Sequence, residues 1–178
     1  VKFHCWCVPE KDLALARAVR EAYPDGEMAF MLDAENSYSR SYALRVAQEL
    51  EDLDFAWLEA PLRDYDLDGY RQLTEAVDIP IIPAGNWIQD LNTFQYGLRS
   101  GCWGRARTDV TIAGGITGAR RFHAAAQNAG LKCEVLSWGN TLVAAAHLHL
   151  MLGDDLCSYF EQAVPFQPYE FGMFDTIR

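Results

Sequence analysis

The chain has 178 residues, 50 % of them hydrophobic, which is typical of a soluble globular domain with one good-sized core. Its formal net charge of -10 and its pI near 4.7 argue against a nucleic-acid or anionic-membrane partner, because such partners require a basic face. No stretch resembles a signal peptide, and no apolar run approaches the roughly 20 residues of a membrane span.

Seven apolar, β-rich runs alternate along the chain with amphipathic segments. The expected strands cover residues 1–7, 28–33, 55–62, 79–85, 105–112, 131–138 and 155–161. Each expected strand but the last is followed by an expected helix, over residues 10–23, 39–53, 66–77, 90–101, 117–130 and 141–152. Strands buried on both faces and alternating with helices predict a parallel sheet.

This many units in strict alternation favour a closed, TIM-like α/β barrel over an open doubly wound sheet. No G-x-G-x-x-G follows any expected strand, and "AGGITG" at 113–118 has the wrong spacing for that fingerprint. The chain begins inside an expected strand and stops after "FGMFDTIR". We therefore expect a single partial barrel domain over residues 1–178, incomplete at both ends.

Five cysteines are dispersed along the chain in apolar surroundings: Cys5, Cys7, Cys102, Cys133 and Cys157. An odd number at irregular spacing disfavours a disulfide framework. We expect reduced, buried thiols and a cytoplasmic location.

Polar residues end most of the expected strands, and in a parallel barrel the catalytic groups lie at the carboxyl ends of the strands. They are Lys2 and His4, Asp33, Glu59, Asn86, Asp109, Leu136 or Ser137, and Glu161. From Asp33 onward the intervals are 23 to 27 residues, counting Leu136, which is close to one strand and helix unit each time. This spacing predicts that successive side chains lie around one rim.

Asp33, Glu59 and Asn86 form an oxygen-only set that suits Mg²⁺. Lys2 and His4 are two residues apart on one expected strand and so point to the same face. A neutral imidazole beside a divalent cation can act as a base on a carbon acid. Taken singly, each acidic residue could instead cap a helix or pair with a cation, and Lys2 and His4 could be surface residues.

Four stretches carry a family resemblance: "MLDAENSYSRSYALRVAQELEDLDFAWLEAPL", "IPIIPAGNW", "RTDVTIAGGITGARRFHAAAQNAGL" and "YFEQ". They present in order an Asp, W-x-E-x-P, A-G-x and D-x-x-x-x-G-G-I-T-G. This order resembles the barrel domain of the enolase superfamily, in its mandelate racemase and muconate lactonizing branch.

The resemblance implies a (β/α)₇β barrel whose second to eighth strands lie in this chain, without the α+β capping domain. It implies an Mg²⁺ held by Asp33, Glu59 and Asn86, where most relatives have Glu in place of Asn86. Members of the superfamily use a Lys or His base to remove the α-proton of a carboxylate substrate.

The same resemblance suggests roles for the remaining positions. The usual Lys-x-Lys motif is Lys2-Phe3-His4 here, so His4 would be the base and Lys2 would polarise the substrate carboxylate. Glu161 matches an acidic position that donates a hydrogen bond to the enolate oxygen in some relatives. We expect Asn36 and Ser137 to contact substrate.

Racemase-like members pair the residue at Asp109 with a histidine, yet Leu136 stands where that histidine would be. Two-base racemisation is therefore disfavoured, and one-base chemistry remains open. Asp109 could act in catalysis, contact substrate or be structural. We expect His123, His147 and His149 to be structural residues of helices.

The leading hypothesis is an Mg²⁺-dependent dehydratase that abstracts the α-proton of a hydroxy-carboxylate or acid sugar. The alternatives are a racemase, epimerase or cycloisomerase of the same superfamily, and a catalytically degenerate binding or scaffold member. A small-molecule carboxylate is the expected partner of a homo-oligomeric protein.

Overall fold

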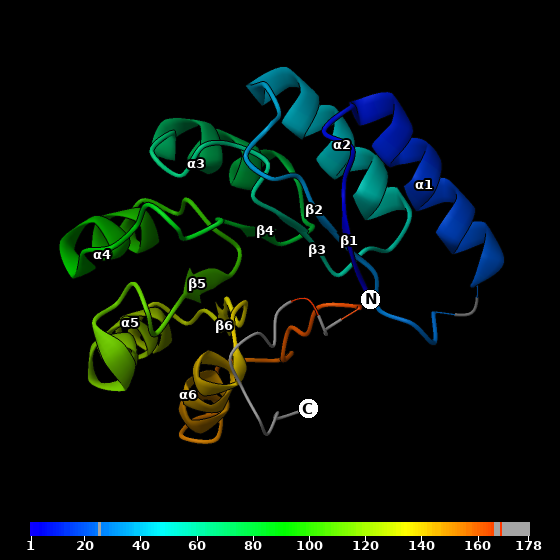
Figure 1. Cartoon of the computed structure of the whole chain (residues 1–178). Helices are drawn as coiled ribbons and strands as arrows, with labels where there is room; N and C mark the ends of the chain where they lie inside the picture. Colours follow the sequence, from blue (N-terminus) through cyan, green and yellow to red (C-terminus); the bar gives the residue numbers. More distant parts are fainter. Residues whose placement is uncertain (25, 166–167, 169–178) are drawn as a thin grey trace. The chain divides into compact units, whose positions relative to one another are not determined.

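The computed structural model describes residues 1–24, 26–165 and 168, in which short parallel strands alternate with helices (Figure 1). The strands are β1 (Lys2–His4), β2 (Met31–Asp33), β3 (Trp57–Glu59), β4 (Ile81–Ile82), β5 (Ala106–Thr108) and β6 (Cys133–Val135). The helices are α1 (Pro9–Ala22), α2 (Arg40–Asp52), α3 (Leu67–Ala76), α4 (Leu91–Arg99), α5 (Gly115–Asn128) and α6 (Thr141–Met151). The first six predicted strands and all six predicted helices are confirmed, although the strands are shorter than the apolar runs.

Two compact units divide the chain, and the first comprises Val1–Trp87 with Gly97–Arg105. Its sheet has the order β1-β2-β3-β4, with every neighbouring pair parallel. Helix α1 packs against α2, and α2 against α3. Side chains buried between these layers form the core, among them Leu13, Ala16, Phe30, Leu32, Ala43, Val46, Leu50, Leu58 and Tyr70.

Helix starts in this unit follow from local side-chain chemistry. Helix α1 has Pro9 at its first position, where the missing N–H is not needed. The Ser39 hydroxyl accepts the Tyr42 N–H at the start of α2, and the Asp66 carboxylate accepts the Gly69 N–H at the start of α3. These caps satisfy backbone donors that a helix leaves unpaired.

The second unit comprises Ile88–Tyr96 and the described residues from Ala106 onward. Its strands β5 and β6 are parallel, and α5 packs on both of them and on α6. The core contains Val110, Ala119, Val135 and Leu150. Apolar residues on α5 and β6 therefore bury one face of the paired strands β5 and β6, as expected for a strand and helix repeat.

The seventh predicted strand, residues 155–161, is wrong: the structure assigns no strand there. One ladder-like bond remains, from the Cys133 N–H to the Leu156 carbonyl. The next amides do not pair with a strand, because the Glu134 carboxylate accepts the N–H groups of Ser158 and Tyr159. The stretch "FGMFDTIR" lies outside the described residues.

All five cysteines, each in the described part of the chain, are free thiols. Cys102 and Cys133 are buried as expected, whereas Cys7 is exposed. The expectation of buried thiols is thus wrong for Cys7 and only partly met by Cys5 and Cys157, which are half-buried. No helix in the described ranges has the length and apolarity needed to cross a membrane.

Candidate metal and proton-transfer site

The ends of β1, β2 and β3 are in register, with His4 opposite Asp33 and Asp33 opposite Glu59. Parallel strands present their carboxyl ends at one edge of the sheet, so residues that end neighbouring strands become neighbours. The predicted proximity of these side chains is observed in the first unit.

The Lys2 ammonium lies between two buried carboxylates. Its Nζ is 2.7 Å from Glu59 Oε1 and 3.5 Å from Asp33 Oδ2. The side chains of Asp33 and Glu59 are only 8 % and 2 % exposed. The other Glu59 oxygen accepts a hydrogen bond from Trp57 Nε1 at 3.2 Å. Two carboxylates that point at one cation form a place where positive charge is stabilised.

Burial raises the pKa of Asp33 to about 6, and the neighbouring Glu59 charge adds to the rise. The Lys2 ammonium and the Glu35 N–H oppose this shift without cancelling it. One ammonium therefore does not fully compensate two buried carboxylates. The carboxylate oxygens of Asp33 and Glu59 are ligands that suit a divalent cation. Their shared contact with the Lys2 ammonium is consistent with a place that stabilises positive charge.

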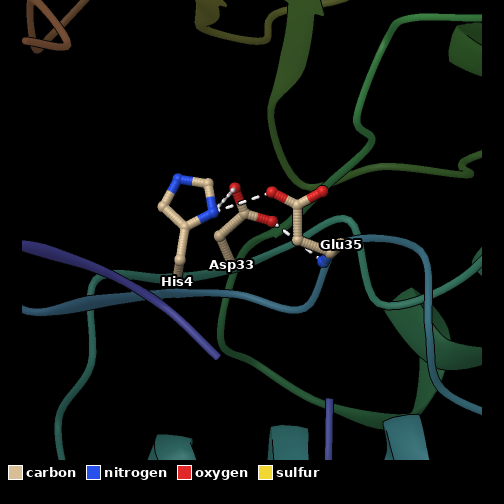
Figure 2. Close-up of side chains that lie close together, drawn as sticks. All are labelled: His4, Asp33 and Glu35. Carbon is tan, nitrogen blue, oxygen red and sulfur yellow. Dashed lines mark hydrogen bonds and ion pairs between the residues drawn. The ribbon is translucent and has the colours of Figure 1, made fainter. Parts of the chain in front are cut away.

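His4 contacts a residue that the sequence reasoning missed, Glu35 (Figure 2). Its Nδ1 is 2.7 Å from Glu35 Oε1 and 3.7 Å from Asp33 Oδ2. An ionised carboxylate only accepts hydrogen bonds, so Nδ1 carries the proton and Nε2 the lone pair in the neutral ring. The signal for Glu35 was its position two residues after Asp33.

Left-handed backbone conformations shape the turn after β2. Glu35 and Asn36 have φ values of 51° and 57°. The Glu35 N–H donates to Asp33 Oδ1 at 3.0 Å, which fixes one oxygen of that carboxylate. The Asn36 N–H donates to the Ala60 carbonyl at 2.7 Å, and its buried Oδ1 has no hydrogen-bond partner among the described residues.

Asn86 is exposed in the loop that follows β4, four residues after Ile82. The buried Asp64 carboxylate accepts the Gly85 N–H at 3.2 Å and the Trp87 N–H at 3.1 Å. Asp64 thus holds the backbone on both sides of Asn86. The sequence reasoning missed this role because 22 residues separate Asp64 from Asn86.

Asp109 follows β5 in the second unit, and its carboxylate is used by nearby donors. Oδ1 accepts the Thr111 N–H at 2.7 Å and the Thr111 hydroxyl at 2.8 Å, and it lies 3.3 Å from His147 Nε2. Burial disfavours ionisation of Asp109, yet contacts from His147 and Thr111 outweigh it and lower the pKa.

His147 is the histidine beside Asp109, and it comes from helix α6 instead of the end of a strand. It is fully buried, as expected for a structural residue. Its Nδ1 lies 3.0 Å from the Val143 carbonyl, and its Nε2 accepts the Val110 N–H at 3.2 Å. Nothing in the spacing of the sequence indicated that His147 and Asp109 would meet.

The other two predicted histidines also lie on helices. His123 on α5 is buried, with Nδ1 2.8 Å from Asp154 Oδ2, whereas His149 on α6 is exposed. His123 thus has a structural partner.

Glu161 and Ser137 contact each other through their backbone and side chain. The Ser137 hydroxyl donates to the Glu161 carbonyl at 2.6 Å and accepts the Glu161 N–H at 2.9 Å. The Glu161 carboxylate accepts from Arg107, at 2.7 Å, and from the Trp138 indole. The sequence did not indicate that Glu161 would contact Arg107 and Trp138.

Parallel strands that alternate with helices and carry polar residues at their adjoining carboxyl ends are features of barrel-type enzyme domains. The protein family described as enolase C-terminal domain-like matches residues 1–176. The chain belongs to this family, and the predicted fold class is confirmed.

Named relatives agree with this assignment. The chain is 31 % identical over 107 residues to L-talarate/galactarate dehydratase of Salmonella typhimurium, a match that covers 60 % of the chain and 26 % of that protein. A solved structure from Pseudovibrio sp., provisionally assigned as a mandelate racemase/muconate lactonizing enzyme, has a TM-score of 0.95 and 37 % identity. That match covers 99 % of the chain and 47 % of the Pseudovibrio protein.

A second solved structure is D-glucarate dehydratase from Agrobacterium tumefaciens complexed with magnesium. Its TM-score is 0.76 at 32 % identity, over 91 % of the chain and 42 % of that protein. The chain therefore spans less than half the length of each of these three proteins.

Proposed function

We propose that the protein carrying this chain is an Mg²⁺-dependent dehydratase acting on a hydroxy-carboxylate or acid sugar. The observation that carries the proposal is the pair of buried carboxylates, Asp33 and Glu59, that share one cation beside His4. This arrangement combines a cation site and a candidate base at one sheet edge. Two of the relatives are named as dehydratases of sugar acids, which supports the same reaction class.

Asp33, Glu59 and Asn86 would hold the Mg²⁺. Asn86 contributes an amide oxygen in place of a carboxylate, so the set carries one negative charge fewer than a set of three acids. Bound Mg²⁺ would stabilise the negative charge that develops on the substrate carboxylate as the α-proton leaves. The magnesium in the Agrobacterium structure supports this choice of ion.

Lys2 and His4 supply the remaining chemistry. The Lys2 ammonium would bind the substrate carboxylate, a role that suits a positive charge already oriented by two acidic side chains. His4 would take the α-proton on Nε2, because Glu35 holds the proton of Nδ1. Glu35 thereby orients the ring as well as setting its tautomer.

Dehydration then needs no second base. The proton that His4 removes from the α-carbon can return to the departing β-hydroxyl, so that water leaves and the enol product remains. Removal and delivery on the same side give a syn elimination. Such a reaction is compatible with Leu136 at the position where racemase-like members have their second base.

Four further residues are proposed to act on substrate, on the strength of the family resemblance: Asn36, Asp109, Ser137 and Glu161. Glu161 would act at the enolate oxygen, the role that the resemblance implies for it, and Asp109 would act in positioning, since its carboxylate already accepts from Thr111. Ser137 and Asn36 remain proposed substrate contacts. For Asn36 the buried oxygen Oδ1 supports the proposal.

Isomerisation is the second candidate, favoured by the assignment of the Pseudovibrio relative. An epimerase or cycloisomerase would also remove an α-proton, but it would return a proton to carbon or close a ring without releasing water. A binding or scaffold protein would do neither.

Proton exchange in deuterated solvent separates these functions. Purified protein with Mg²⁺ is incubated with a panel of acid sugars, and α-deuterium and product are followed by NMR. We expect Mg²⁺-dependent exchange together with a dehydrated keto-acid product. Exchange with inversion and no loss of water would indicate an isomerase, and absence of both exchange and dehydrated product across the panel would refute α-proton abstraction.

The proposal extends to location and assembly. Five free thiols favour a reducing compartment such as the cytoplasm. A homo-oligomer is proposed as well, and sedimentation of the purified protein would test it.

A further inference from the structure

His4, Asp33 and Glu35 form a cluster that differs in chemistry from the proposed Mg²⁺ set. One imidazole nitrogen and two carboxylate oxygens lie within 4.8 Å of one another (Figure 2). His4 ends β1, Asp33 ends β2, and Glu35 follows in the turn. The cluster is therefore built from residues that the sheet and the turn bring together.

The mixed nitrogen and oxygen donors select a particular class of cation. Imidazole suits Zn²⁺, Cu²⁺ and Ni²⁺, whereas Mg²⁺ favours oxygen donors and keeps several waters. An ion bound here would thus be a divalent transition metal ion. Such an ion and Mg²⁺ would both require Asp33.

Distances in the cluster are close to those around a bound ion. With bonds of about 2.0 to 2.2 Å, ligand atoms of a tetrahedral zinc site lie about 3.4 Å apart. His4 Nδ1 is 2.7 Å from the Glu35 oxygen and 3.7 Å from the Asp33 oxygen, values on either side of that separation. Small side-chain movements would bring all three atoms to ligand distance.

The two residues that need to move are the exposed ones. The side chains of His4 and Glu35 are 42 % and 54 % exposed, whereas that of Asp33 is 8 % exposed. Asp33 is further fixed by the Glu35 N–H on Oδ1, which leaves Oδ2 directed toward His4. The cluster therefore combines one rigid ligand with two adjustable ones.

We propose that His4, Asp33 and Glu35 bind a divalent transition metal ion such as Zn²⁺, and that this binding inhibits the enzyme. The inhibitory part rests on the proposed function, because the ion takes Asp33 from the Mg²⁺ ligands and binds His4 through the Nδ1 lone pair, so that the ring proton moves to Nε2, the atom proposed to take the α-proton. The binding part stands on the cluster alone.

Cys5 and Cys7 are the competing zinc ligands nearby. Their Sγ atoms are 3.8 Å apart, and the Cys7 N–H donates to Cys5 Sγ at 3.2 Å. These thiols are candidate ligands for the same ion, so the test needs a variant without them.

Zn²⁺ titration calorimetry on the purified protein tests the binding site. Glu35→Gln is compared with wild type, with Glu75→Gln as the matched control, because Glu75 is exposed and pairs with Arg71. We expect the Zn²⁺ Kd to rise at least about tenfold in Glu35→Gln. In Glu75→Gln and in the double variant Cys5→Ser/Cys7→Ser, the Kd should stay within about twofold of the wild-type value. Unchanged affinity in Glu35→Gln, or loss of binding in the cysteine variant, would overturn the proposal.

A spectroscopic measurement identifies the nitrogen ligand. Cu²⁺ bound to wild type should show nitrogen hyperfine structure in its electron paramagnetic resonance spectrum, and His4→Gln should lose it. Circular dichroism of each variant checks that it is folded. Nitrogen structure that persists in folded His4→Gln would assign the ion to another histidine and refute the site.

Mg²⁺-dependent α-proton exchange, measured on the same preparations, separates the two proposals. If wild type exchanges protons, Zn²⁺ should inhibit it at concentrations near its Kd. If wild type shows neither exchange nor dehydrated product while Zn²⁺ binding depends on Glu35, the metal site stands and the dehydratase proposal fails. Exchange that is insensitive to saturating Zn²⁺ would refute the inhibitory part alone.

Discussion

Two acidic residues of the first unit, Asp33 and Glu59, differ from two of the second unit, Asp109 and Glu161, in how their negative charges are compensated. Asp33 and Glu59 are buried beside the Lys2 ammonium, and the pKa of Asp33 is raised. Asp109 accepts from Thr111, and Glu161 from Arg107 and Trp138. The pKa of Asp109 is lowered. A buried carboxyl group whose pKa is raised beside a second carboxylate favours a bound cation, whereas the lowered pKa of Asp109 reflects donors that already stabilise its negative charge.

The largest expected effect is on proton transfer. His4→Gln removes the proposed base, and we expect the Mg²⁺-dependent α-proton exchange rate to fall by about 10² to 10⁴. His149→Gln, an exposed substitution on α6, is the matched control and should keep the wild-type rate. If His4→Gln exchanges α-protons at the wild-type rate, His4 is not the base and another residue removes the proton.

Magnesium affinity tests the contrast between the two acidic pairs directly. Glu59→Gln should weaken Mg²⁺ binding at least about tenfold in calorimetry, because it removes a buried charged ligand. Glu161→Gln should leave the affinity within about twofold, since Arg107 and Trp138 already hold that carboxylate. Equal losses in the two variants would contradict the distinction.

The free energy of unfolding should depend more on the buried ion pair of the second unit than on a surface ion pair. Arg107 is 2 % exposed at its side chain and pairs with Glu161, so Arg107→Met should lower the free energy of unfolding by about 3 kcal/mol in urea titrations. Arg45 pairs with Glu10 at the surface, where the side chains are 52 % and 60 % exposed. Arg45→Met should cost less than about 1 kcal/mol. A loss for Arg107→Met as small as that control would mean that its ion pair is not structural.

The smallest expected effect concerns a capping carboxylate of the first unit. Asp66 accepts the Gly69 N–H, and Asp66→Ala should lower stability by about 1 kcal/mol. The hydrogen bond from Arg40 lowers the Asp66 pKa below its usual 3.8. This contribution is therefore complete above about pH 4 and is lost as the pH falls through the folded-state pKa.

Urea unfolding of wild type and Asp66→Ala at pH 7 and pH 3 measures that dependence. The stability difference between the two proteins should shrink at pH 3. Asp68→Ala, at an exposed position in the first turn of α3, is the control and should show a smaller difference at pH 7. A stability difference between wild type and Asp66→Ala that is larger at pH 3 than at pH 7 would contradict the predicted pH dependence.

Much of the fold could be predicted because its elements have local causes. The stripe that includes Leu13 and Ala16 marks a buried helix face, and Pro9 marks the helix start. The predicted strand at 155–161 was wrong because Glu134, a side chain distant in sequence, takes the amides that a strand partner would use. Periodicity carries no information on such a competitor.

The candidate site divides in the same way. Regular spacing of strand ends was enough to predict that His4, Asp33 and Glu59 would be neighbours. It was not enough to find the contact of Glu35 with His4, which depends on the left-handed turn after β2.

The sequence by itself determined the alternation of strands and helices and the residues that end the first three strands, because period, turn residues and caps act within a few residues. Only the tertiary structure decided which charges meet. The positions of Lys2 between two carboxylates and of His147 beside Asp109 depend on side chains separated by at least 31 residues. Coulomb interaction and desolvation depend on distance in space, and the packing of the sheet and helices sets that distance.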